Sequence, residues 1–398
     1  MQAVCARNAA RHVVCSKARR PTEMTMRDTA IAPRDDRHTG EHQSGQDPGM
    51  PATAAADTAF CIEVLPRVSR TFALSIEALP ATLRSAVRSA YLLCRVVDSI
   101  EDGPALGRQR RTELFDVFDR MLSDDASDAL EFESACVRVA VGGTGVDGEL
   151  CRGAGAVFRS FRALPVAQRE AIRPHVLEMS AGMRAYCARG VNLRLADLED
   201  LERYCYFVAG TVGNLLTALF EQTVPRLRDD ARQSLRERAV SFGLGLQMVN
   251  VVKDVATDFV ERGACYLPLR IAREHGLELD RLLDPAMRQA GLGVVRTVCT
   301  RARAHLQRAE EYVALWPASG EDGEAGRAVR LFCLVPLALA LATLRTVEQG
   351  ENTLRAGVTP KVSRGAVARV VAEAPAAAAS DQALAALLGR CDREGPPA

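Results

Sequence analysis

The sequence lacks the cysteine and histidine spacings that mark a structural metal site. Its 12 cysteines never fall as C-x-x-C, and its six histidines do not cluster with them. Neither a zinc site nor a disulfide framework is therefore predicted. Cysteines scattered through apolar helical patterns pack as small hydrophobic side chains, and this usage is typical of a reducing compartment. A cytoplasmic location is predicted.

The chain also has little net charge and no uncharged segment of membrane-spanning length. Its formal net charge is +1, so there is no overall basic footprint for nucleic acid, and no nucleic-acid partner is predicted. Residues 331–344 carry no charge, but this run is shorter than the roughly 20 residues that cross a bilayer. We expect it to form a core helix.

No series of alternating strands and no internal repeat is visible, whereas apolar residues recur at intervals of three and four from Asp57 onward. This period predicts an all-α domain over residues 56–375. The expected helices are 57–79 with a break or kink at Pro66, 81–100, 110–122, 128–141, 149–163, 166–188, 197–222, 228–260, 269–276, 284–315, 324–349 and 363–374.

Both ends of the chain differ from this domain. Residues 1–55 have no apolar periodicity and are predicted to be a disordered extension. The first 22 residues hold five Lys or Arg and no acidic residue, which fits a transit peptide or a start codon assigned too early, with Met24, Met26 and Met50 as alternative starts. Residues 376–398, which include four consecutive alanines and a Pro-Pro pair, are predicted to be a flexible tail.

One glycine motif resembles a dinucleotide fingerprint. Gly143, Gly145 and Gly148 match G-x-G-x-x-G and follow the short apolar segment 137–141. That pattern binds dinucleotides when it joins a strand to a helix within alternating strands and helices, which this chain lacks. We interpret it as a connection between two helices.

Two carboxylate pairs stand about 150 residues apart, Asp98 with Asp102 and Asp254 with Asp258. In a helix, i,i+4 residues share one face, so each pair forms an acidic ledge. Other polar residues fall on the same two arcs: Arg95 on the first, Gln247 and Asn250 on the second. Acidic pairs are often solvated helix faces, but these have apolar flanks, which predicts that they face a cavity. Mg²⁺ relieves the repulsion in such a cavity, held by one or two carboxylates and substrate phosphates.

Three further segments carry chemical groups. Ser69 and Arg70 together supply donors for phosphate oxygens. Tyr204 precedes Gly210 and Gly213 in an apolar helix, where the glycines indicate close approach of another helix or a ligand. Residues 361–365 form a small basic group. Surface exposure or simple packing is the alternative for each segment.

Four motifs in this order and spacing resemble the squalene and phytoene synthase family. They are Ser69-Arg-Thr-Phe72, Asp98-Ser-Ile-Glu-Asp102, Tyr204-Cys-Tyr-Phe-Val-Ala-Gly210, and Gln247 to Asp254 with Asp258. The match spans roughly residues 58–370. The resemblance implies an all-α isoprenoid-synthase fold, in which helices surround a central cavity and Mg²⁺ binds between the two aspartate motifs.

Prenyl diphosphate chemistry fits these residues. Breaking an allylic carbon–oxygen bond releases diphosphate and a carbocation, so the site needs cations on the oxygens and a dry cavity. The expected metal ligands are Asp98, Glu101, Asp102, Asp254 and Asp258. The expected substrate-binding residues are Ser69, Arg70, Arg95, Gln247, Asn250 and Lys253, of which Arg70, Arg95 and Lys253 would also assist catalysis by neutralising diphosphate oxygens. The resemblance implies that Tyr204 or the released diphosphate assists proton removal.

Within the family, the first aspartate motif and the segment from Phe332 to Arg364 resemble squalene synthases. The resemblance implies that Lys361, Arg364 and Asn250 contact NADPH, and that two farnesyl diphosphates give presqualene diphosphate and then squalene. The alternatives are a phytoene or dehydrosqualene synthase without NADPH, favoured by residues 264–268, and a non-catalytic assembly protein. A hydrocarbon product would bring the enzyme to the periphery of a membrane. The sequence does not specify the oligomeric state.

Two positions depart from the family pattern. Thr257 stands where the second motif commonly has Glu, and Lys253 stands where Arg is common. Both outer aspartates of the motif remain, so metal binding is expected to survive. The first change removes one carboxylate from the ledge.

Overall fold

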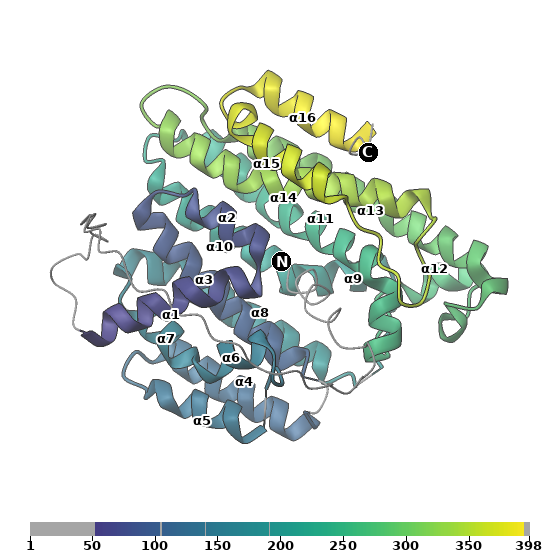
Figure 1. Ribbon diagram of the computed structural model, residues 1–398, viewed down its shortest axis with the longest axis horizontal. Helices are drawn as coiled ribbons and strands as arrows, with labels where there is room; N and C mark the ends of the chain where they lie inside the picture. The colour runs from purple at the N-terminus through teal and green to yellow at the C-terminus, as the bar shows by residue number, and fades with distance from the viewer. Residues whose placement is uncertain (1–51, 104–105, 140, 191, 394–398) are drawn as a thin grey trace, which may run out of the picture.

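The computed structural model describes residues 52–103, 106–139, 141–190 and 192–393, and the regular elements within these ranges are all helical (Figure 1). An isolated bridge between Arg194 and Cys265 is the exception. The prediction of an all-α domain is confirmed. The α-helices are α1 Ala52–Val68, α2 Arg70–Glu77, α3 Ala81–Glu101, α4 Arg108–Ser123, α5 Ala129–Val139, α6 Val146–Arg152, α7 Ala154–Arg162, α8 Val166–Cys187, α9 Leu198–Cys205, α10 Thr211–Thr223, α11 Asp229–Arg262, α12 Leu269–Glu274, α13 Arg288–Leu315, α14 Gly323–Gln349, α15 Arg364–Ala378 and α16 Asp381–Arg393.

Two helices that are buried on nearly all sides form the centre of the fold. α3 packs against α1, α2, α6, α7, α8 and α10, and α11 packs against α9, α10, α13 and α14. Figure 1 shows α4 to α7 on one side of this centre and α13 to α16 on the other. A helix that is apolar on all faces belongs in a core, so the polar residues on α3 and α11 are held inside the protein.

Several helix boundaries differ from those expected. The first helix ends at Val68 rather than at Pro66, because Ser69 is extended (φ −158°) and its hydroxyl accepts a hydrogen bond from the Phe72 amide at the start of α2. The expected helix 149–163 is divided at Gly153, where a Cβ would lie 2.3 Å from Phe60. The expected helix 197–222 contains a π-helical turn, Tyr206–Gly210.

The predicted flexible tail from residue 376 is wrong as far as Arg393. α15 continues to Ala378, and α16 buries Leu384, Leu387, Leu388 and Cys391. These four residues recur at helical intervals, and α16 packs on α14 and α15. Of the predicted disordered extension, residues 1–51 lie outside the described residues, whereas residues 52–55 belong to α1.

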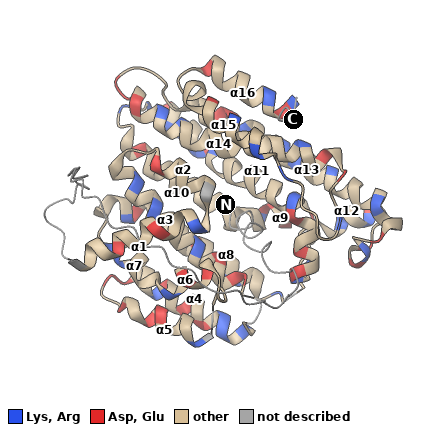
Figure 2. Cartoon of the chain, in the orientation of Figure 1, with Lys and Arg blue, Asp and Glu red and all other residues tan. Residues whose placement is uncertain are grey.

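The apolar run 331–344 lies within α14, as expected for a core helix. Among the described residues α14 alone is long and apolar enough to cross a membrane, but 72% of its most apolar window is buried inside the protein. In the view of Figure 2, Lys and Arg are interspersed with Asp and Glu along the outer helices.

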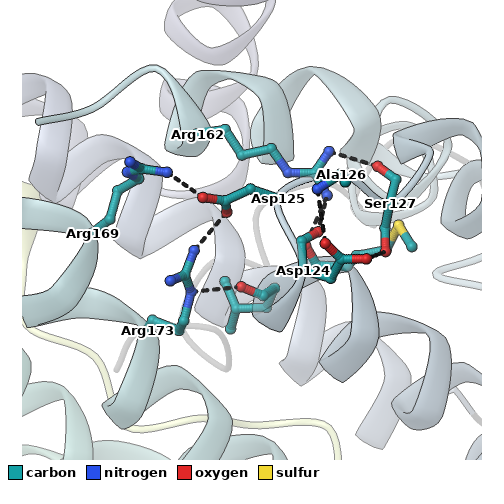
Figure 3. A network of polar contacts seen from close by, with 9 residues as sticks. Asp124, Asp125, Ala126, Ser127, Arg162, Arg169 and Arg173 are labelled. Atoms are coloured by element: carbon teal, nitrogen blue, oxygen red, sulfur yellow. Dashed lines mark hydrogen bonds and ion pairs between the residues drawn. The ribbon is translucent and has the colours of Figure 1, made fainter. Parts of the chain in front are cut away.

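The connection between α4 and α5 is fixed by a polar network (Figure 3). Asp125 accepts hydrogen bonds from Arg169 and Arg173, both on α8. Arg162 at the end of α7 donates to the carbonyls of Met121 and Ser127 at 2.9 and 2.8 Å. These contacts join α4, α7 and α8 and stabilise the fold on the side away from α11.

The seam between α11 and the π-helical turn depends on Gly243. A Cβ at this position would lie 2.1 Å from the Ala209 carbonyl oxygen. We expect Gly243→Ala to lower the free energy of unfolding by about 2–3 kcal/mol, because two backbones must separate. Chemical denaturation measures this change.

Gly365 is the matched control, because it lies in the first turn of α15 and a Cβ there would approach only Arg369 Nη1, at 3.9 Å. Gly365→Ala should be neutral or stabilise by up to about 1 kcal/mol. Equal effects of the two substitutions would contradict the close approach at Gly243.

Candidate active site

Carboxylates from both predicted ledges line one cavity. Asp98, Glu101 and Asp102 enter it from α3, and Gln247, Asn250 and Asp258 enter it from α11. All six were expected from the sequence. Tyr204 and Tyr266 close another side of the same cavity. Asp98 and Asp102 therefore face the same cavity, as the i,i+4 spacing predicts, whereas of the second pair only Asp258 lines it.

Arg262 joins the two ledges and was not expected. Its Nη1 donates to Asp102 Oδ1 at 2.8 Å and lies 3.6 Å from Asp258 Oδ1. It follows Asp258 by four residues on α11, so the same spacing rule that identified the aspartates could have found it. Its guanidinium supplies positive charge between the two acidic groups.

Burial governs the ionisation of the acidic groups. It raises the pKa of Asp258 to about 7, against the lowering effect of Arg262. It also raises the pKa of Glu101 to about 8, with the charges of Asp102 and Asp98 adding to the rise. The carboxylates are therefore short of compensating positive charge.

Asp254 lies deepest on the second ledge, with 1% of its surface exposed. Its Oδ2 is 2.7 Å from Lys253 Nζ, and within the described part of the chain its Oδ1 accepts no hydrogen bond. Burial raises the pKa of Asp254, against the charge of Lys253. A buried oxygen without a partner suits an additional cation.

The donor set fits Mg²⁺, which prefers oxygen ligands. Among the residues that the structure describes, however, no three Asp, Glu, His or Cys side chains converge on one point as a complete site. Mg²⁺ usually takes one or two carboxylates and completes its coordination with phosphate oxygens and water. The separated ledges suit that kind of shared site.

Arg95 lines an apolar cavity that shares Asp98 with the acidic one. It is 2% exposed, and its Nη1 lies 3.8 Å from Asp98 Oδ2. Asp98 lines both cavities. The apolar cavity is otherwise walled mainly by Phe72, Ile76, Val87, Leu215, Leu216 and Phe332. A ligand with a charged head and a hydrocarbon chain matches this arrangement.

Tyr204 reaches the first ledge. Its hydroxyl donates to Glu101 Oε1 at 3.3 Å, and its ring stacks on Tyr266 with centroids 4.8 Å apart. Burial and the charge of Glu101 raise the pKa of Tyr204 well above its ordinary value, so the hydroxyl keeps its proton. The π-helical turn that follows is a feature often found at functional sites.

A third pocket adjoins the second ledge and brings together Asn250, Lys253 and Lys361. Arg364 is exposed at the start of α15 and is not among the residues that line this pocket. Ser69 is buried, and its hydroxyl caps α2 as described above. The side chain of Arg70 lies outside the described residues.

Thr257 contacts the segment that carries Lys361. Its Oγ1 lies 3.1 Å from Thr359 Oγ1, two residues before Lys361. The hydroxyl that replaces the common Glu thus joins α11 to the connection between α14 and α15. The sequence alone offered no role for this departure.

Comparison with known proteins gives a consistent result. A sequence model of the family "Squalene/phytoene synthase" matches residues 65–366. The chain is 27% identical over 315 residues to squalene synthase 10 of Panax ginseng, covering 79% of this chain and 69% of that protein. It is 28% identical over 323 residues to a squalene synthase of Eremothecium gossypii, covering 80% and 68%.

Solved structures show the same fold. A structure of TcSQS with a bound ligand matches with a TM-score of 0.70 and 26% identity, covering 84% of this chain and 90% of that one. A dehydrosqualene synthase with a bound ligand matches with a TM-score of 0.56 and 20% identity, covering 81% and 96%. The predicted isoprenoid-synthase helical fold is therefore confirmed.

Proposed function

Because this chain belongs to the squalene/phytoene synthase family, a class of prenyltransferases, we propose that it joins two farnesyl diphosphates head to head and reduces the presqualene diphosphate to squalene with NADPH. The observation that carries the proposal is the cavity shared by α3 and α11, which is lined by carboxylates of both ledges and by Arg262 and lies beside an apolar cavity lined by Arg95. This arrangement suits a diphosphate head and a prenyl chain.

The residues of the chain have separable roles in the first step. Asp98, Asp102, Asp254 and Asp258 would hold Mg²⁺, with Glu101 assisting. Bound Mg²⁺ supplies positive charge to the diphosphate oxygens as the carbon–oxygen bond breaks. Arg95, Lys253 and Arg262 add fixed positive charge, and Gln247 and Asn250 orient the head group.

The carbocation that remains needs a dry cavity and a route for its proton. The walls beside Asp98 supply apolar surface, and the stacked Tyr204 and Tyr266 exclude water at the acidic end. Because Tyr204 is protonated and bonded to Glu101, we assign it the positioning of released diphosphate, which then accepts the proton.

The reduction is proposed for the pocket beside the second ledge. Lys253 and Lys361 present two cations there, a suitable pair for the phosphates of NADPH, and Asn250 lies between this pocket and the acidic cavity. Bound NADPH supplies the hydride of the second step. We propose Arg364 as an outer contact only, because it does not line the pocket. The hydrocarbon product suits an enzyme that works at the periphery of a membrane, with α14 kept in the core.

Incubation of the purified protein with labelled farnesyl diphosphate and Mg²⁺, with and without NADPH, tests this function. We expect squalene only when NADPH is present, and no product when EDTA replaces Mg²⁺. Extraction into organic solvent and chromatography identify the product. Dehydrosqualene alone, or phytoene from geranylgeranyl diphosphate, would replace the proposal with a synthase that uses no NADPH. No product from either substrate would refute catalysis.

A further inference from the structure

The glycine turn before α6 brings one carboxylate to α3. Gly142 and Gly143 have φ values of +69° and +65°, and a Cβ at Gly148 would lie 1.9 Å from the Gly143 carbonyl oxygen. Glycine permits this tight return of the chain onto the first turn of α6. Asp147 lies in that turn, and α6 packs directly against α3. The glycine motif of residues 143–148, which resembles a dinucleotide fingerprint, therefore shapes the turn that precedes α6.

Asp147 is the main hydrogen-bonding partner of Arg95. Nε and Nη2 of Arg95 donate to Asp147 Oδ1 at 2.9 and 2.7 Å. Its Nη1 makes no hydrogen bond to any described residue and faces Asp98 at 3.8 Å. Asp147 therefore holds one edge of the guanidinium, and Nη1 on the other edge faces Asp98, which lines both the acidic and the apolar cavity.

The two carboxylates compete for the same cation. Arg95 is almost completely buried, so its charge must be balanced by nearby groups rather than by water. Asp147 has the short distances of charge-assisted hydrogen bonds, whereas Asp98 is too distant for one. Without the charge of Asp147, the nearest anion for Arg95 is Asp98, a proposed metal ligand.

We infer that Asp147 is a positioning residue of the diphosphate site: it holds Arg95 by one edge and thereby keeps the guanidinium from closing onto Asp98. Nη1 is then directed to a diphosphate oxygen, and Asp98 keeps its charge for the metal ion. The inference rests on the function proposed above for Arg95 and Asp98.

Glu149 provides a matched control on the same helix. Both of its carboxylate oxygens accept hydrogen bonds from Arg67 at 2.6 Å, so it fastens α6 to α1. It lines neither the acidic nor the apolar cavity. Glu149→Gln therefore loosens α6 without changing the charge beside Arg95, whereas Asp147→Asn changes that charge.

The test is calorimetric titration of the full-length protein with inorganic pyrophosphate in the presence of Mg²⁺. We expect Asp147→Asn to raise the Kd about tenfold, equivalent to about 1.4 kcal/mol. Asp147→Glu keeps the charge but shifts the guanidinium, so we expect a rise of about threefold. Glu149→Gln should stay within about twofold of the unmodified protein. Circular dichroism verifies that each variant is folded.

Unchanged or tighter binding in Asp147→Asn overturns the inference, and so does a loss of equal size in Glu149→Gln. If Asp147→Asn does not fold, an unchanged Kd in Asp147→Glu overturns it. In an Arg95→Lys background, Asp147→Asn should add little, because coupled residues are not additive; full additivity counts against the inference. If Arg95→Lys by itself leaves the Kd unchanged, the function proposed for Arg95 fails instead.

Discussion

Replacing Asp254 by Asn is expected to lower kcat/KM for farnesyl diphosphate about a thousandfold, or about 4 kcal/mol of transition-state stabilisation. The substitution keeps the shape of the side chain but removes the charge that is proposed to hold Mg²⁺. Asp98→Asn should cause a loss of similar size from the opposite ledge. Steady-state rates measured across a range of Mg²⁺ concentrations check both variants.

Asp254→Asn should lower activity without lowering the stability of the fold. Burial raises the pKa of Asp254, so Asp254→Asn removes an unfavourable buried charge but also the contact with Lys253 Nζ at 2.7 Å, and these opposed effects should leave the Tm little changed. The matched control is Glu261→Gln, an exposed carboxylate on the same helix, which should leave the rate within about twofold. If Asp254→Asn and Asp98→Asn retain turnover with the same Mg²⁺ dependence, the metal-assisted mechanism is wrong.

The metal-free protein is expected to lose stability as pH rises from about 5 to 8, by an amount of the order of 5 kcal/mol. Burial raises the pKa of Asp258 to about 7 and that of Glu101 to about 8, both well above their values in an unfolded chain. The folded protein therefore binds more protons than the unfolded chain in this window. Its unfolding free energy falls with pH until both groups are ionised, and then levels off.

Magnesium pyrophosphate should oppose this loss, because cations bind the ionised carboxylates. A ligand at about 100 times its Kd adds about 2.7 kcal/mol. The Kd should be lower at pH 8, where the carboxylates are ionised, so at one fixed ligand concentration the shift in Tm should be larger at pH 8 than at pH 5. Thermal denaturation across this pH range, once in EDTA and once in Mg²⁺ with pyrophosphate, measures how Tm changes with pH in the metal-free and in the ligand-bound protein. A metal-free Tm that is constant or rises across this range would contradict the prediction.

The variant Asp258→Asn isolates the contribution of one group. In the metal-free state, Asp258→Asn should reduce the fall in Tm with rising pH. The difference in Tm between the variant and the unmodified protein at each pH cancels the contributions of the other titrating groups. His175 is one of these, since burial lowers its pKa and makes stability rise with pH. Asp200 does not interfere, because its bonds to Arg189 hold its pKa at about 2, so it loses its contribution only below this window.

The sequence predicted what depends on local spacing. Apolar residues at helical intervals located the helices, and the i,i+4 spacing indicated that Asp98 and Asp102 share a face, because one helix dictates the relative directions of its own side chains. Arg262 lay within reach of the same argument. The face of α16 did too, although the alanines before it suggested an unstructured tail.

Contacts between distant segments could not be predicted in this way. Asp147 contacts Arg95, which lies 52 residues away in the sequence, and Thr257 contacts Thr359, which lies 102 residues away. No local sequence pattern links the two members of either pair. The packing of whole helices decides such contacts. The π-helical turn is a further case, because its extra residue per turn is set by neighbouring helices and not by its own composition.

Because α15 and α16 cover α14 but follow it in the sequence, α14 is synthesised before the helices that bury it. The ribosome completes α14 roughly 40 residues before α16, an interval of a few seconds at about 5–20 residues per second. During that interval the nascent chain presents a helix whose length and composition match a membrane span. Packing of α15 and α16 on α14 therefore covers apolar surface that would favour aggregation if it stayed exposed.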